Sequence, residues 1–301
     1  MDAFYQSLHY RLAMGLQVLP DKPEENPDNT LHALWHAAAG QPRSVATAMQ
    51  AALPPLADEA RQNLRELVER RLAGEPLAYL TSRGHFMGLE LLAGPDALIP
   101  RTETELLARA CTELLQSALA HHPVRVIDVC TGSGNLAFAI AHHVPGAEVF
   151  GADISAEAIA LATRNREHLG LSRVALRCGD LLAPFDAGFD GTVDLVVCSP
   201  PYILSTKVEQ MAREISAHEP RLAFDGGPLG VSILLRLLEE SPRLLRAGGW
   251  LAFEAGLGQG PAMHRRLERD SHYDEVRACT DERGDIRAIL ARRAPAQEHR
   301  T

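Results

Sequence analysis

The sequence lacks several features that define whole classes of protein. No apolar run in its 301 residues approaches the roughly 18 residues that span a bilayer. Its five cysteines form no Cys-x-x-Cys pair and its thirteen histidines form no His-Glu-x-x-His motif, so no metal site is expected. The net charge of −9 disfavours a protein that holds nucleic acid by bulk electrostatics, so nucleic acid is not expected as a partner.

A secretory signal is also absent from the first residues, MDAFYQSLHYRLAMG, because no basic stretch precedes an apolar one. We therefore expect a cytoplasmic protein with no membrane contact. Hydrophobic residues make up 46% of the chain and charged residues 23%, which is typical of a soluble globular protein. The length allows one large domain or two smaller ones, and it leaves the oligomeric state open.

Two sequence patterns, one in each part of the chain, indicate different kinds of structure. The first is helical: apolar residues at three- and four-residue spacings predict a helix over residues 56–74, and the Pro/Asn/Asp-rich stretch 17–30 indicates a loop. We predict a helical N-terminal domain over 1–83, a β-hairpin linker over 84–100, and a further domain over 101–301.

Strands alternate with helices in the second pattern, which predicts a parallel, doubly wound α/β sheet of the Rossmann-like type. The predicted strands are 124–129, 147–155, 174–180, 193–199 and 250–256, followed by closing strands at 274–281 and 286–293. The predicted helices are 136–144, 156–170 and 231–249. The strands are almost continuously apolar, as expected where helices cover both faces of a sheet.

Ligands of such sheets bind beyond the carboxyl ends of the strands. Asp128 and a glycine-rich loop follow the first predicted strand, Asp153 ends the second, and Asp180 ends the third. Each aspartate alone is explained as a turn or helix-capping residue. Together they fit a cationic nucleoside that carries no pyrophosphate, because the loop lacks the third glycine of a dinucleotide fingerprint. S-adenosylmethionine is such a ligand.

The fourth strand ends in an unusual corner, within the stretch VVCSPPYIL. Two consecutive prolines cannot continue the strand, because neither donates to the ladder. The corner Ser199-Pro200-Pro201-Tyr202 is therefore rigid and carries one hydroxyl and one aromatic ring. Such a corner is suited to presenting side chains to a ligand.

These motifs together resemble the HemK/PrmC family of S-adenosylmethionine-dependent class I methyltransferases, which methylate a glutamine side-chain amide in peptide chain release factors. The matching segments are 70–91, 98–107, 126–141, 151–155, 199–203, 219–227 and 244–256. Residues 1–55 contain no segment that we match to the family, in which a helical N-terminal substrate domain is usual. The resemblance implies that residues 1–83 are a substrate-recognition domain and that residues 101–301 are the S-adenosylmethionine-dependent methyltransferase domain, which is catalytic.

The resemblance implies roles for individual residues. The cofactor, released as S-adenosylhomocysteine, would be bound by Asp128, Thr131, Gly132, Ser133, Gly134, Asp153, Ile154, Asp180, Leu181 and Ser199. The substrate pocket would be bordered by Arg101, Glu103, Pro201 and Glu219, and we also expect an ion pair between Glu219 and Arg221.

The corner carries the catalytic roles, which the resemblance assigns to Ser199, Pro200 and Tyr202. The family has Asn-Pro-Pro-Tyr here: the asparagine oxygen and the carbonyl of the first proline accept hydrogen bonds from the target amide nitrogen, and the tyrosine ring packs on the amide. Ser199 departs from this pattern, since serine reaches less far and can donate as well as accept. Thr102 also replaces a proline that is usual in the family.

The departure at Ser199 keeps several functions open. The leading hypothesis is N-methylation of a protein glutamine amide, with a release factor as partner. The alternatives are methylation of a small-molecule amine, amide, guanidine or hydroxyl, methylation of nucleic acid, and binding of S-adenosylmethionine without catalysis.

Overall fold

The computed structural model describes residues 3–119 and 122–295, which divide into two compact units. The first unit runs up to Arg101 and also takes in Gln210–Pro220, while the second holds Thr102–Glu209 and the chain from Arg221 onward. Each unit has its own hydrophobic core. No helix in this described part of the chain is long and apolar enough to cross a lipid bilayer.

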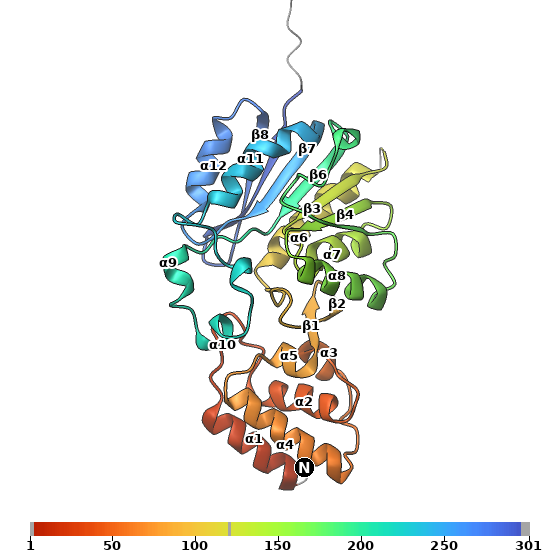
Figure 1. Cartoon of the computed structure of the whole chain (residues 1–301), viewed down its shortest axis with the longest axis vertical. Helices are drawn as coiled ribbons and strands as arrows, with labels where there is room; N and C mark the ends of the chain where they lie inside the picture. The colour runs from red at the N-terminus through yellow and green to blue at the C-terminus, as the bar shows by residue number, and fades with distance from the viewer. Residues whose placement is uncertain (1–2, 120–121, 296–301) are drawn as a thin grey trace, which may run out of the picture. The chain divides into compact units, whose positions relative to one another are not determined.

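The first unit is a small helical bundle with one hairpin (Figure 1). Its elements are α1 (Ala3–Gly15), α2 (Pro27–Ala38), α3 (Val45–Ala48), α4 (Asp58–Leu72), α5 (Leu77–Thr81), β1 (Arg83–Phe86), β2 (Leu89–Leu92) and α10 (Arg213–Ser216). The core is built where α1, α2 and α4 meet, and Leu12, Leu34 and Leu64 are fully buried there. The periodic apolar positions along these helices supply that buried face.

Two details of this unit refine the predictions. The stretch 17–30 is not all loop, because α2 begins at Pro27 behind Asn26, whose side chain accepts a hydrogen bond from the Asn29 amide at 3.1 Å. An asparagine cap followed by proline is a helix start. The hairpin turns at Met87 and Gly88, both at positive φ, as tight two-residue hairpin loops require.

The second unit is a seven-stranded sheet in the order β5-β4-β3-β6-β7-β9-β8, with helices on both faces (Figure 1). Its strands are β3 (Arg125–Val129), β4 (Glu148–Asp153), β5 (Ala175–Cys178), β6 (Val193–Cys198), β7 (Leu245–Glu254), β8 (Tyr273–Thr280) and β9 (Ile286–Arg293). Its helices are α6 (Thr104–Leu119), α7 (Asn135–His143), α8 (Ala156–His168), α9 (Ser205–Val208), α11 (Ser232–Leu244) and α12 (Gly260–Glu268), with short 3₁₀ turns η1 (Ala187–Phe189) and η2 (Arg221–Ala223). The predicted doubly wound fold is confirmed.

Strands β3 to β7 are parallel, whereas β9 runs antiparallel to both its neighbours. The chain winds outward from β3 through β4 to β5, then crosses back to β6 on the other side of β3. The sheet therefore has its topological switch point between β3 and β6, where ligands of such folds bind at the carboxyl ends.

One boundary differs from the prediction. The helix expected to reach residue 249 ends at Leu244, and β7 begins at once with Leu245, which pairs with Val193. The strand then bulges around Gly248 and Gly249 before pairing resumes at Trp250. A side chain at Gly249 would lie 2.7 Å from the Val193 carbonyl oxygen, so the close approach of two backbones fixes glycine here.

Candidate active site

The glycine-rich loop after β3 is organised around a buried carboxylate. Asp128 is fully buried, and its Oδ2 accepts hydrogen bonds from the Thr131 hydroxyl at 2.5 Å and the Ala137 amide at 3.1 Å. Burial raises the pKa of Asp128 to about 7. Gly134 caps α7 at φ 87°, where a side chain would collide with the Phe138 ring at 2.1 Å. The loop therefore needs glycine and closes tightly over Asp128.

Asp153 lies at the end of the neighbouring strand β4. Its two oxygens accept from the Gly132 amide and the Ser155 amide, each at 2.9 Å, which ties it to the glycine-rich loop. Burial raises the pKa of Asp153. The next residue, Ile154, is 55% exposed, which is unusual for isoleucine at the end of a buried strand.

Asp180 and Leu181 follow β5. The Asp180 carboxylate forms a bidentate pair with Arg236 of α11, with nitrogen–oxygen distances of 3.2 and 3.0 Å. Leu181 is buried at a positive φ of 44°, a conformation that L-residues rarely adopt. Asp180, which the sequence analysis places among the cofactor-binding residues, therefore also has an internal ion-pair partner.

Two buried polar atoms lie in the glycine-rich loop and at the end of the strand before it. Asp128 Oδ1 and Ser133 Oγ have no hydrogen-bond partner within the described residues, although both side chains are at most 2% exposed. An unpaired buried polar atom costs on the order of 1–3 kcal/mol, so such atoms are normally satisfied. A cationic, hydrogen-bonding ligand would satisfy both, and S-adenosylmethionine has this chemistry.

The serine corner follows β6, the strand beside β3. Because Val129 pairs with Cys198 in the parallel ladder, Ser199 and the glycine-rich loop emerge at the same edge of the sheet. The Gln259 amide nitrogen donates to the Tyr202 carbonyl at 3.0 Å and holds the backbone of the corner. The corner and the loop therefore share the switch point of the sheet.

A residue that the sequence analysis missed lies beside this corner. Glu254 ends β7, and the pairing of Cys198 with Phe253 places it next to Ser199. Its carboxylate accepts from the Ser199 hydroxyl at 2.9 Å and from the Tyr202 hydroxyl at 3.0 Å. The rule that directs attention to strand ends would have found it, had it been applied to the fifth strand as well.

The four predicted substrate-pocket residues fall in two units. Arg101 and Glu219 both belong to the first unit, where the guanidinium Nη2 lies 2.6 Å from Glu219 Oε1. Glu219 Oε2 also accepts from the Ile99 amide at 3.0 Å. Glu103 and Pro201 belong to the second unit.

The expected pair between Glu219 and Arg221 is wrong, because each residue has other partners. Arg101 binds Glu219, while Arg221 lies 3.6 Å from Glu209 and 3.5 Å from Asp225. Glu219 is 5% exposed, whereas the side chain of Arg221 is 56% exposed. The buried carboxylate is therefore neutralised by a guanidinium that is itself largely buried.

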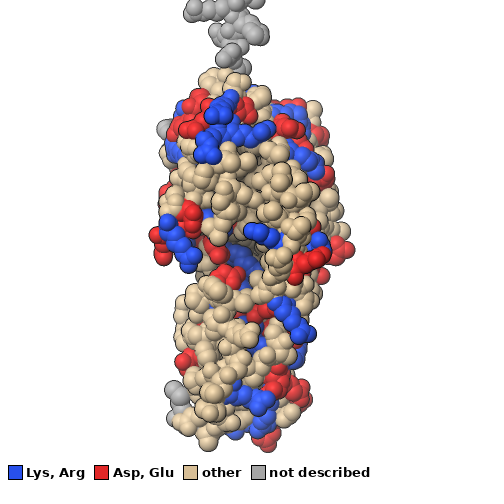
Figure 2. All heavy atoms as spheres, turned by 90° about the vertical axis from the view of Figure 1, so that its left-hand side faces the viewer, with Lys and Arg blue, Asp and Glu red and all other residues tan. Residues whose placement is uncertain are grey.

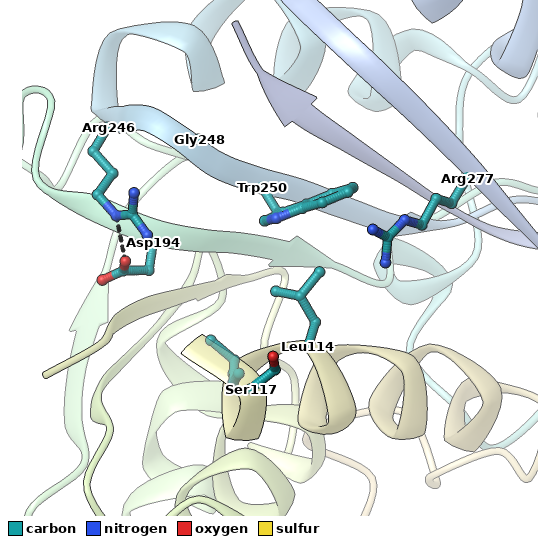
Figure 3. A pocket seen from close by; sticks show the side chains of 8 residues that line it. Leu114, Ser117, Asp194, Arg246, Gly248, Trp250 and Arg277 are labelled. Carbon is teal, nitrogen blue, oxygen red and sulfur yellow. Dashed lines mark hydrogen bonds and ion pairs between the residues drawn. The ribbon is translucent and has the colours of Figure 1, made fainter. Parts of the chain in front are cut away.

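A separate hollow of about 240 Å³ lies at the opposite ends of the strands (Figure 3). Asp194 near the start of β6 and Trp250 near the middle of β7 line it, together with Leu114 of α6. Arg246 pairs with Asp194 at 2.5 Å, and the Arg277 guanidinium stacks 4.6 Å from the centre of the Trp250 ring. Its charged groups are already paired, and it is distant in the fold from the carboxyl ends that carry the loop and the corner.

Surface charge is mixed on the face drawn in Figure 2, where Lys and Arg side chains are interspersed with Asp and Glu. Net negative charge and this interspersion differ from the extended basic face that phosphate backbones require.

Two protein families match the sequence. A PrmC N-terminal domain matches residues 12–81, and a methyltransferase domain matches residues 120–254. The first match extends into residues 1–55, where sequence inspection found no family segment. The helical N-terminal region therefore matches a described family domain.

Curated relatives cover most of the chain. A protein of Moorella thermoacetica named release factor glutamine methyltransferase is 36% identical over 86% of this chain and 88% of its own length. Proteins with the same name match from Salmonella typhimurium, at 36% identity over 80% and 84%, and from Streptomyces coelicolor, at 40% over 65% and 68%. Among solved structures, the catalytic domain of hMettl16 in complex with MAT2A 3′UTR hairpin 1 superposes with a TM-score of 0.55 at 17% identity, over 74% of this chain and 83% of that one. The last likeness shows the fold alone.

Proposed function

Because the chain belongs to the release factor glutamine methyltransferase family, we propose that it transfers a methyl group from S-adenosylmethionine to a glutamine side-chain amide of a peptide chain release factor. The observation that carries this proposal is the position of the Ser199–Tyr202 corner beside the glycine-rich loop, at the switch point of the sheet. A release factor as substrate would place the enzyme in the cytoplasm.

The cofactor supplies an activated methyl group on a cationic sulfur. Asp128 and Ser133 would bind it through the atoms that have no partner among the described residues, and Asp153 would accept from the ribose hydroxyls. Both aspartates belong to the set that the sequence predicted. The negative charge they bring matches the positive charge of the cofactor.

The corner would bind and orient the acceptor. An amide nitrogen is a poor nucleophile, so an enzyme gains most by fixing its direction and by drawing electron density toward it. Ser199 Oγ and the Pro200 carbonyl are the acceptors for its two N–H groups, and the Tyr202 ring packs on its plane. Both hydroxyls of the corner are held by Glu254, which keeps them in one orientation.

Methylation of a small molecule is not favoured. That alternative was motivated by the unmatched first 55 residues and by Ser199, and the N-terminal family match removes the first motive. The second motive is the Ser199 side chain alone, since Pro200, Pro201 and Tyr202 all match the corner of the family.

The test is methyl transfer in a purified system. The protein, release factor and labelled S-adenosylmethionine should give a release factor that carries one added methyl group, which tandem mass spectrometry should locate on a glutamine side chain. A protein substrate that stays unlabelled, while a metabolite fraction of a cell lysate becomes labelled, would show that the acceptor is a small molecule.

A further inference from the structure

Glu254 is a buried carboxylate held mainly by hydroxyl groups. It is 2% exposed, and its Oε2 accepts from Thr104 Oγ1 at 2.7 Å and from Ser199 Oγ at 2.9 Å. Its Oε1 accepts from the Tyr202 hydroxyl at 3.0 Å, and the Arg287 guanidinium lies 3.7 Å away. Three hydroxyls from two segments, α6 and the Ser199–Tyr202 corner, therefore meet on one side chain.

An ionised carboxylate can only accept, so it fixes the direction of each hydroxyl proton. Ser199 has one proton and two lone pairs, and a hydroxyl without such a partner rotates freely between donating and accepting. Once its proton is bound to Glu254, the serine oxygen is left only as an acceptor. This is the role that the asparagine oxygen has in the Asn-Pro-Pro-Tyr corner that the sequence resembles.

We propose that Glu254 is a positioning residue, which binds the hydroxyl protons of Ser199 and Tyr202 and thereby makes the Ser199 oxygen an acceptor for the substrate amide. This inference rests on the proposed function. It explains how a serine replaces asparagine without loss of the reaction, because the missing amide oxygen is replaced by a hydroxyl oxygen that can only accept a hydrogen bond.

Tyr202 supports the same arrangement. Burial, followed by the negative charge of Glu254, raises the pKa of Tyr202 well above its usual value, so its hydroxyl stays protonated and donates. The backbone at Tyr202 has independent support from Gln259, and a side chain at Gly256 would approach the tyrosine ring to 2.9 Å. Changing Glu254 should therefore turn the hydroxyls and leave the path of the corner in place.

The experiment compares four variants of the full-length protein in methyl transfer to release factor. E254M keeps the side-chain volume and removes both oxygens, and E254Q keeps one acceptor oxygen. S199A and the double variant E254M/S199A complete a cycle. Loss of one oriented hydrogen bond in the reacting complex should lower kcat roughly 10- to 100-fold in E254M and by a smaller factor in E254Q.

The expected pattern separates positioning from a structural role. The KM for release factor and the affinity for S-adenosylmethionine should stay within roughly threefold in E254M, since kcat carries the effect. E254M/S199A should be no worse than S199A by more than roughly threefold, because Glu254 acts through Ser199. The matched control is S241A, which removes a buried hydroxyl 3.0 Å from the Tyr273 hydroxyl in the same unit and should leave kcat unchanged.

A second readout needs no substrate. In protein labelled at the tyrosine ζ carbon, the resonance that disappears in Y202F should shift in E254Q and remain unmoved in S241A. An unchanged kcat in E254M would overturn the proposal. So would a loss of kcat in the double variant equal to the product of the two single losses, or a Tyr202 resonance that does not shift in E254Q. If E254M does not fold, the kcat and the Tyr202 resonance of E254Q provide the test. If the wild-type protein methylates no release factor, the proposed function is overturned instead. The Tyr202 resonance would then be the only test of the hydrogen bonds between Glu254 and the corner.

Discussion

Two buried carboxylates at the same edge of the sheet are held in different ways. Asp128 has one oxygen bound by Thr131 and Ala137, and its other oxygen has no partner within the described residues. Glu254 has both oxygens occupied, mainly by hydroxyls. Each is at most 2% exposed, so the difference does not come from solvent.

This difference separates two tasks. A buried carboxylate with a free oxygen is incomplete without a ligand, because the unpaired atom destabilises the protein until something binds to it. Glu254 needs no ligand to satisfy its oxygens, because three hydroxyls already donate to them, and it holds those neighbours in place. Asp128 is therefore assigned to the cofactor, and Glu254 to the orientation of the corner.

The largest effect should follow removal of Asp153, which ties the glycine-rich loop to β4. In D153A the ribose would lose its acceptor and the Gly132 amide would lose its partner. Two hydrogen bonds to a charged group correspond to roughly 100-fold or more in affinity for S-adenosylmethionine, measurable by calorimetry. D190N is the matched control, since Asp190 is an exposed carboxylate of the same unit that pairs with Arg243. Equal affinities in D153A and D190N would contradict the assignment.

The open oxygen of Asp128 should make cofactor binding depend on pH. With a pKa of about 7, raised by burial, the carboxyl is mostly protonated at about pH 6. A cationic ligand favours the ionised form, so binding must release the proton and affinity should fall by up to about tenfold per pH unit below 7. Calorimetry between about pH 6 and pH 8 should show this slope in the wild type and a flatter one in D128N. The same slope in both proteins would exclude Asp128 as its source.

A smaller effect should follow S199N, which restores the corner of the family. Asparagine would donate its amide protons to Glu254 and offer a fixed oxygen to the substrate, so kcat on release factor should rise by a few-fold, up to about tenfold. The affinity for the cofactor should not change by more than roughly twofold. A lower kcat in S199N would mean that the site is shaped for an acceptor that fits serine.

Much of this site could be predicted from the sequence because its signals are local. Asp128, Asp153 and the Ser199 corner each follow an apolar run, and strand ends in a parallel sheet gather at one edge. Glu254 escaped notice because it lies inside the fifth predicted strand, 250–256, and reads as part of an apolar segment. Its partners come from α6 and from the corner after β6, and only the folded sheet brings them together.

Other parts of the structure depend on contacts with no local pattern. The segment around α10 belongs to the first unit, where buried Glu214 binds Arg71 at 2.7 Å and Lys22 at 3.3 Å. These partners lie more than 140 residues away in the sequence. Charges this far apart in the sequence give no periodic pattern. From the sequence alone, residues 210–220 are therefore predicted as part of the domain over 101–301.

The most direct test of the account is the turnover of S199A on release factor. If the Ser199 oxygen accepts from the substrate amide, kcat should fall roughly 10- to 100-fold while the affinity for S-adenosylmethionine stays within about twofold. If S199A methylates release factor at the wild-type rate, the serine oxygen accepts nothing from the substrate, and neither the acceptor role of the corner nor the positioning role of Glu254 stands.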